Sequence, residues 1–173
     1  KENTRQINYI KQALIRPDME ALRLTSNSMI KGLLVQISDQ SNPDRMVIEK
    51  GREQLSVFED YYKQYMNANQ NDYRIRMNYA HLLMIKTILG ENRLADARKI
   101  IEDSYSLSPN HPLTYALDAL TYLYEGKIKL AKEKINEGIA LNPKIEFSKK
   151  VLAHIEKQEK SFPEISVLKL ENL

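Results

Sequence analysis

Cysteine and tryptophan are absent from the chain, and glycine and proline are scarce. Among 173 residues there are five glycines and six prolines. Without cysteine the chain can form no disulfide and no thiolate-ligated metal site. Glycine and proline interrupt regular structure, so their scarcity favours long helices joined by few turns. No apolar run approaches the ~20 residues of a membrane-spanning helix, so we expect no membrane insertion by this stretch of chain.

Sequence motifs of catalysis are also missing. There is no glycine-rich phosphate loop, no GxSxG motif and no HExxH motif. The three histidines, His81, His111 and His154, are far apart in the sequence, whereas a metal site needs several converging ligands. We expect His81 and His154 to lie on helix faces and His111 to lie in a turn. The sequence therefore predicts neither a metal site nor a cofactor.

The carboxylates show the pattern of solvated helix surfaces. Glu59 and Asp60 are neighbours, and adjacent helix residues point in different directions, so they suggest no acid–base pair with perturbed pKa values. Asp96 with Arg93 or Lys99 is typical of ordinary surface pairing. We therefore predict that the chain is not an enzyme.

The net charge is +3, and four lysines gather in one stretch: Lys127, Lys129, Lys132 and Lys134. We favour a solvated helix face for them. The alternative is a surface for nucleic acid or another anionic polymer. On the favoured interpretation no nucleic-acid partner is expected.

Between residues 78 and 143 the sequence repeats with a period of 34 residues. Four pairs stand that distance apart: Ala97 and Ala131, Ile101 and Ile135, Leu107 and Leu141, and Pro109 and Pro143. A 34-residue helix–turn–helix period is the signature of tetratricopeptide repeats, which stack into solenoids. The chain therefore resembles the tetratricopeptide family.

The last repeat, 112–145, carries the resemblance best. It supplies the aromatic, small and proline positions of the family pattern: Tyr115, Ala119, Tyr122, Ala131, Ile135, Gly138 and Pro143. Small residues let the two helices of a unit approach, and the aromatics fill the space that is left. In the preceding repeat Ala97, Ile101 and Pro109 keep the pattern, and we expect its first helix over 73–89.

The resemblance implies an all-α fold, a right-handed α-solenoid of antiparallel helical hairpins with about eight helices. Apolar spacing and breakers predict further helices over 4–16, 17–39, 43–67, 94–107 and 145–157. Asn42 is expected to cap the helix that Pro43 begins. We divide the chain into divergent hairpins (1–72), two repeat hairpins (73–144), a capping helix (145–160) and a docking tail (161–173).

Ten tyrosines are present, and Tyr61, Tyr62 and Tyr65 cluster on the helix expected over 43–67. We expect them to pack in the core or at its boundary. The alternative is an aromatic strip that binds a peptide or a sugar.

The family resemblance also bears on the concave face of the solenoid. Many chaperone-binding members hold a peptide C-terminus there with Lys and Asn, but the corresponding positions of the last repeat are Ala116 and Leu120. We therefore expect an apolar groove for an amphipathic helix or an apolar tail of a protein or peptide partner. The predicted groove residues are Leu113, Ala116, Leu120, Leu123 and Tyr124.

The tail after Pro163 is more apolar than a disordered segment would be. Its expected contact residues are Ile165, Val167, Leu168 and Leu170. We favour docking on its own solenoid over docking on another copy or another protein.

The order of the elements further resembles the C-terminal tail of bacterial membrane proteins of the O-antigen ligase/polymerase family, in which a tract similar to residues 7–23 follows the last membrane helix. This implies an accessory module on the extracytoplasmic or cell-surface side of a bacterial membrane. The chain begins with Lys1 and not Met, so we expect a processed product or a part of something longer.

The sequence supports two hypotheses of function. The first is a non-catalytic protein–protein interaction or scaffold module, accessory to a bacterial cell-surface polysaccharide ligase. The alternative is a structural protein that self-assembles into head-to-tail homo-oligomers or filaments.

Overall fold

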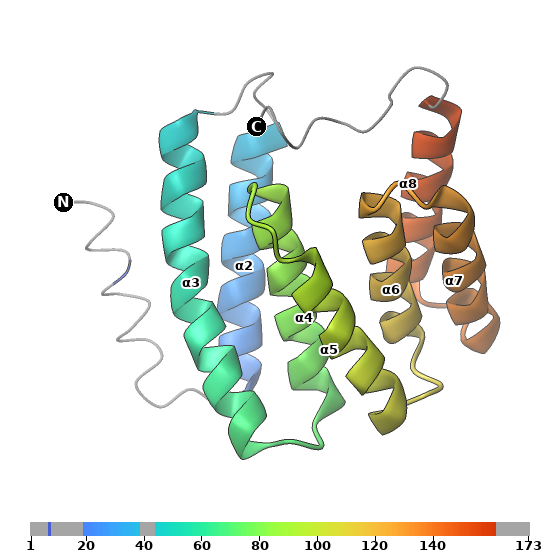
Figure 1. Ribbon diagram of the computed structural model, residues 1–173, viewed down its shortest axis with the longest axis horizontal. Helices are drawn as coiled ribbons and strands as arrows, with labels where there is room; N and C mark the ends of the chain where they lie inside the picture. Colours follow the sequence, from blue (N-terminus) through green and yellow to red (C-terminus); the bar gives the residue numbers. More distant parts are fainter. Residues whose placement is uncertain (1–6, 8–18, 39–43, 162–173) are drawn as a thin grey trace.

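The computed structural model describes Ile7 and residues 19–38 and 44–161. Within these residues every regular element is an α-helix, as predicted (Figure 1). The helices are α2 (Met19–Ser38), α3 (Arg45–Ala68), α4 (Tyr73–Ile88), α5 (Leu94–Leu107), α6 (Pro112–Tyr124), α7 (Ile128–Leu141) and α8 (Glu146–Ser161). The helix expected over 4–16 lies outside the described residues, apart from Ile7, which is helical.

Successive helices pack as antiparallel hairpins: α2 with α3, α4 with α5, and α6 with α7 (Figure 1). The first helices of the hairpins also contact one another, α2 with α4 and α4 with α6, and α8 packs on both α6 and α7. The molecule is therefore an α-solenoid of helical hairpins. The first helix of each unit lines one side of the array, and the second helix lies against it.

Glycine makes the turn inside two of the hairpins. Gly90 (φ 84°) follows α4, and Gly126 (φ 74°) follows α6, and such positive φ values strain any residue with a Cβ. Between hairpins, Pro112 occupies the first turn of α6, where its missing N–H is no loss. The sequence therefore sets both the turns within the repeats and the start of the last one.

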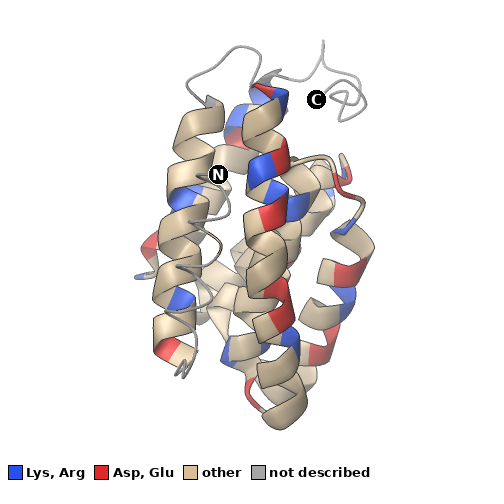
Figure 2. Cartoon of the chain, turned by 90° about the vertical axis from the view of Figure 1, so that its left-hand side faces the viewer, with Lys and Arg blue, Asp and Glu red and all other residues tan. Residues whose placement is uncertain are grey.

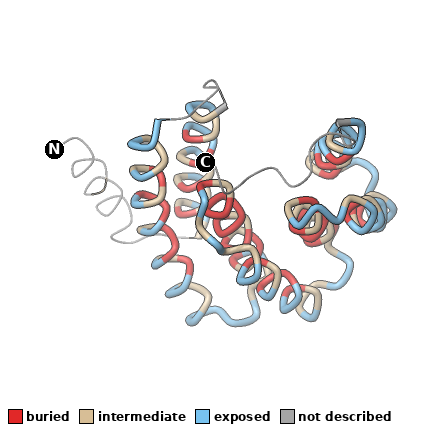
Figure 3. The backbone as a smooth tube through the Cα atoms, turned by 45° about the horizontal axis from the view of Figure 1, so that its top comes forward, coloured by how far each residue is buried: buried red, intermediate tan, exposed pale blue. Residues whose placement is uncertain are grey.

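The helix α4 is the centre of the larger hydrophobic cluster. Its run of four residues 82–85 is buried on every side, because α2, α3, α5 and α6 all contact it (Figure 3). A helical stretch that is apolar on every side belongs in the interior. The two largest fully buried side chains that join it there, Phe58 and Tyr62, come from α3.

A second, smaller cluster joins α6, α7 and α8. Its buried members are Ala116, Ala119, Leu123, Ala131, Ile135, Val151 and Ile155. The small residues let α7 approach α6 closely, and at Gly138 an added Cβ would lie 2.7 Å from Cβ of Tyr115. Partly buried Leu120 and Phe147 pack against both clusters and link the two parts of the core.

Two helix ends differ from their expected positions. The helix α3 begins at Arg45 and not at Pro43, because Asp44 is the N-cap: its ψ of 126° is not helical, and its carboxylate accepts a hydrogen bond from the Met46 N–H at 2.9 Å. The helix α8 runs to Ser161, four residues beyond the expected end. Its polar last turn contains good helix formers, and no breaker precedes Pro163.

Charges of both signs are interspersed along the outer helix faces (Figure 2). In the part of the chain that is described, no helix is both long enough and apolar enough to cross a membrane.

Candidate functional site: a groove along the first helices of the repeats

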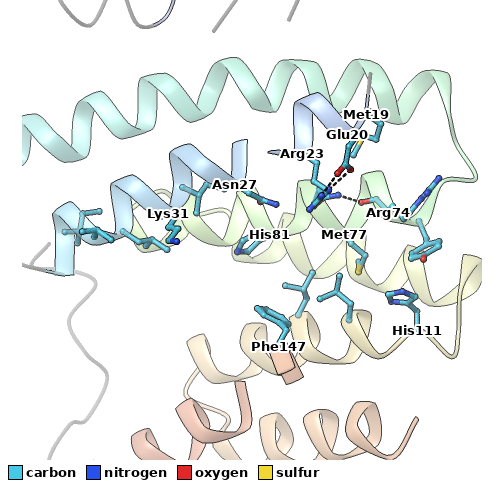
Figure 4. Close-up of a pocket in the computed structure, with 18 residues that line it drawn as sticks. Met19, Glu20, Arg23, Asn27, Lys31, Arg74, Met77, His81, His111 and Phe147 are labelled. Carbon is cyan, nitrogen blue, oxygen red and sulfur yellow. Dashed lines mark hydrogen bonds and ion pairs between the residues drawn. The ribbon is translucent and has the colours of Figure 1, made fainter. Parts of the chain in front are cut away.

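A groove of about 970 Å³ follows the first helices of successive hairpins. Its walls come from α2, α4 and α6 and from the start of α8 (Figure 4). The lining residues are Met19, Glu20, Arg23, Asn27, Ile30, Lys31, Leu34, Val35, Ile37, Tyr73, Arg74, Met77, Asn78, His81, His111, Leu113, Leu117 and Phe147. The groove is therefore a product of the stacking, because no single repeat supplies it.

The floor of the groove is apolar. Ile30, Met77 and Leu117 are almost fully buried, from α2, α4 and α6 respectively. Partly buried Leu113 and Phe147 continue the floor toward α8. An apolar, concave surface with a few polar groups at its edge is the usual character of a site that buries a ligand or a peptide segment.

Positively charged side chains stand along the α2 and α4 sides. Arg23 donates to the Glu20 carboxylate from Nε at 2.8 Å and from Nη2 at 2.5 Å. Arg74 similarly donates to Asp72, with Nη2–Oδ2 at 3.1 Å. Lys31 is exposed and has no ion-pair partner among the residues that the structure describes. Because Arg23 pairs with Glu20 and Arg74 pairs with Asp72, the excess of positive charge along these sides comes from Lys31.

Two of the three histidines line this groove, although they are 30 positions apart in the sequence. His81 lies on α4, and burial lowers its pKa. His111 is the residue before α6, as the expected turn residue, and its ring packs against Tyr73 with centroids 4.6 Å apart. Burial lowers the pKa of His111 also. His154 is exposed on α8, away from the groove lining.

The predicted groove residues of the last repeat divide between the groove and the core. Leu113 lines the groove. Ala116 and Leu123 are buried in the cluster of α6, α7 and α8, and Leu120 and Tyr124 are partly buried against the core. The structure thus places only part of the predicted set in the groove. The role of these five residues in binding stays a prediction.

The predicted repeat-core residues lie mostly inside. Ala97, Ile101, Ala119, Ala131 and Ile135 are fully buried. In addition, Gly138 is buried, Tyr115 and Tyr122 are half-buried, and Pro109 and Pro143 are exposed in the connections. The predicted tail contacts Ile165, Val167, Leu168 and Leu170 lie outside the described residues.

The tyrosines of α3 pack inward. Tyr62 is buried, with its hydroxyl 2.8 Å from the Ser26 hydroxyl on α2, and Tyr61 and Tyr65 are partly buried against the same cluster. In the lysine stretch, Lys127, Lys132 and Lys134 each pair with a glutamate. Both observations favour the structural interpretation over a binding strip or an anion surface.

Two buried carboxylates have perturbed pKa values, which the sequence did not indicate. Glu59 is buried on α3, and although burial acts to raise its pKa, hydrogen bonds from Lys63 and Lys86 and the charges of Lys86 and Arg93 lower it to about 2. Asp118, buried on α6, has a pKa that burial raises, even though Tyr105 and Arg98 act against the rise. Neither residue lines the groove. The interactions of Glu59 and Asp118 connect neighbouring helices. The surface ion pair expected from the sequence, Arg93 with Asp96, is present.

Sequence reasoning missed the α2 and α4 sides of the groove. The signal was present as spacings of four residues on the first helix of each unit: Arg23 with Asn27, Met77 with His81, and Leu113 with Leu117. Only the last repeat matched the family pattern closely enough to place its inner face. No cluster of three or more potential metal ligands occurs among the described residues.

No protein-family model matches the chain, and no curated protein matches it. Among solved structures, the NMR structure of the first TPR domain of the human RPAP3 protein is similar to it, with a TM-score of 0.53 and 16% sequence identity. The match covers 68% of this chain and 93% of that domain. At this level of identity the likeness shows the fold: the chain has the tetratricopeptide-like architecture of stacked helical hairpins.

Proposed function

We propose that the chain is a non-catalytic interaction module that holds a segment of a partner protein in the groove of α2, α4, α6 and α8. The observation that carries the proposal is the apolar surface that the groove leaves in contact with water, at exposed Val35 of α2 and at partly exposed Leu113 and Phe147. The buried side chains of Ile30, Met77 and Leu117 support this surface from below. Covering this apolar surface removes it from water, the main source of affinity in recognition of this kind. The TPR domain of the similar structure supports a protein partner.

Selection from a library of displayed random peptides tests the proposal. With peptides of about 16 residues, long enough for about four helical turns, we expect the whole chain to enrich binders. Binding of these peptides should be lost in Leu34→Glu and in Leu113→Glu, since each places a charge on the apolar groove surface. Leu130→Glu is the matched control, because Leu130 is 41% exposed on α7, outside the groove.

Circular dichroism of each variant must first show an unchanged helix content and thermal midpoint. Peptides that bind wild type and the Leu130 variant equally, but neither groove variant, support the proposal. Failure to enrich any peptide whose binding depends on the groove overturns it.

Self-assembly is the second candidate function, and it rests on the apolar character of 165–170 in the sequence. An apolar tail that completes a neighbouring copy would give head-to-tail contacts that do not close. Light scattering across a hundredfold concentration range tests it with the full chain. A mass that climbs with concentration supports self-assembly, and a constant mass near 20.1 kDa excludes it.

An accessory role beside a bacterial cell-surface polysaccharide ligase is the finer form of the first hypothesis. It rests on the sequence resemblance alone. Co-purification of the chain with the membrane part of such a ligase, lost in the groove variants, would support it. Co-purification that survives both groove variants would place the contact on another surface.

A further inference from the structure

Two similar pairs of side chains face the groove from neighbouring helices. On α2, Arg23 and Asn27 are four residues apart, and on α4 Arg74 and Asn78 have the same spacing. Side chains at this spacing share a helix face. Since α2 and α4 contact each other, the two pairs belong to adjoining sides of the groove, called here its basic wall. Figure 4 shows Arg23, Asn27 and Arg74 among the residues that line it. Lys31 extends the wall toward the end of α2.

The net charge of this wall is positive after its ion pairs are counted. Arg23 pairs with Glu20, and Arg74 pairs with Asp72 beside the groove, so the excess comes from Lys31. Lys31 has no ion-pair partner in the described part of the chain, and its exposed ammonium is open to a ligand. The excess positive charge attracts an anionic partner segment and repels a cationic one. Such charge complementarity determines which partner binds more than how tightly it binds.

The ion pair of Glu20 and Arg23 shows how the wall can hold a carboxylate. Two nitrogens of Arg23 donate to two oxygens of Glu20, at 2.8 and 2.5 Å, which is the two-point geometry that a guanidinium offers to any carboxylate. The pair is exposed on the first turn of α2, so exchange of Glu20 for a partner carboxylate costs little.

We propose that the groove takes an acidic amphipathic segment, a stretch of partner protein whose apolar face covers the floor and whose Asp or Glu side chains lie against Arg23, Lys31 and Arg74. This proposal rests on the proposed function and specifies the chemistry of the partner. The apolar floor and the basic wall adjoin along the groove, so the ligand carries its acids along one edge of its apolar face.

The composition of the selected peptides tests this inference separately from binding itself. We expect peptides enriched on the wild-type chain to carry an excess of Asp and Glu over Lys and Arg. Their affinity should fall about ten-fold when salt is raised from about 50 to about 300 mM, because exposed charge pairs are screened. In the double variant Lys31→Glu with Arg74→Glu we expect the selection to turn to Lys- and Arg-containing peptides.

The matched control is Lys129→Glu with Lys150→Glu. Both lysines are exposed and lie outside the groove, so the double variant makes the same change in net charge without touching the wall. It should enrich the same acidic peptides as wild type.

Each result has a distinct meaning. Groove-dependent binders with no charge preference overturn the inference and leave the proposed function standing. An acidic preference that the control variant also loses overturns the inference too, since net charge alone then explains it. A synthetic peptide of residues 161–173 serves as a second probe. If this peptide displaces the acidic binders and loses affinity in the Lys31/Arg74 variant, the occupant is the chain's own tail, and a partner segment is excluded as the resident ligand.

Discussion

Glu59 of α3 and Lys86 of α4 form a buried ion pair, with Oε2 2.5 Å from Nζ and side chains only 5% and 4% exposed. Further donors surround the same carboxylate: Arg93 at 2.6 Å, Lys63 at 2.8 Å and the Tyr79 hydroxyl at 3.2 Å. Lys86 also contacts the Ser56 hydroxyl. The network joins the second helix of one unit to the first helix of the next, and so fixes how the two units stack.

We expect Lys86→Met to destabilise the fold by about 3 kcal/mol, because loss of one partner from a buried pair leaves the other charge poorly compensated. Urea unfolding monitored by circular dichroism measures the change in the free energy of unfolding.

Lys63→Met is the matched control for Lys86→Met. Lys63 pairs with the same carboxylate, but its side chain is 49% exposed, so we expect a cost below about 1 kcal/mol. Equal losses of unfolding free energy in Lys86→Met and Lys63→Met would show that burial does not determine how much each lysine stabilises the fold through Glu59.

The same carboxylate makes the fold sensitive to acid. The pKa of Glu59 is lowered to about 2 in the folded chain, against 4.5 for an ordinary glutamate. The unfolded chain therefore binds the proton first, and the stabilisation that Glu59 gives above pH 4.5 is lost as the pH falls toward 2. We expect about 1–2 kcal/mol of this stabilisation to disappear between about pH 5 and 3.

Comparison with Glu59→Gln isolates this part of the pH dependence. The difference in unfolding free energy between wild type and the variant should be largest near neutral pH and should shrink below pH 4.5. Asp118 acts in the opposite direction, because its pKa is raised, but it is present in both proteins and cancels. Parallel stability curves from pH 7 to 3 would contradict the assignment.

The fold was predictable because its determinants are local and repeated. The 34-residue spacing of Ala97 and Ala131 fixed the hairpins, and α5 occupies the expected residues 94–107. The start of α3 was misjudged because Asn42, Pro43 and Asp44 all favour helix starts. Only the backbone conformation of Asp44 decides among them.

The site was much less predictable. Glu59 and Lys86 are 27 residues apart, and no periodic pattern joins a position of α3 to one of α4. The groove depends likewise on how α2 stacks on α4, and α2 does not match the repeat pattern. Leu113 could be placed from sequence because its repeat matches the family pattern, whereas Arg23 and Arg74 required the stacked structure.

A glycine of α7 offers a test of the close helix contact. In Gly138→Ala the new Cβ would meet Cβ of Tyr115 at 2.7 Å and the Pro112 carbonyl at 3.1 Å. We expect a loss of about 1–2 kcal/mol, because overpacking outweighs the gain in helix propensity. Thermal unfolding of the variant measures it.

Gly32→Ala is the control, since Gly32 is exposed on α2 and its added Cβ would meet nothing within 4 Å. This variant should gain about 0.5–1 kcal/mol from propensity alone. If Gly138→Ala were stabilising to the same degree, α6 and α7 would not be in the close contact described above.

Glu20 provides the last prediction, which concerns binding. Its carboxylate occupies Arg23 at the mouth of the groove, so an acidic ligand must compete with it. We expect Glu20→Gln to tighten the binding of the selected acidic peptides by about two- to five-fold, as an exposed pair of modest strength is removed. Fluorescence anisotropy with a labelled peptide measures the change.

Glu49→Gln is the matched control for Glu20→Gln. Glu49 pairs with Arg45 at 2.7 Å on α3, outside the groove, and the substitution makes the same change in net charge. If both variants tighten binding equally, long-range charge explains the effect. If Glu20→Gln weakens binding, Glu20 positions Arg23 for the ligand and does not compete with it.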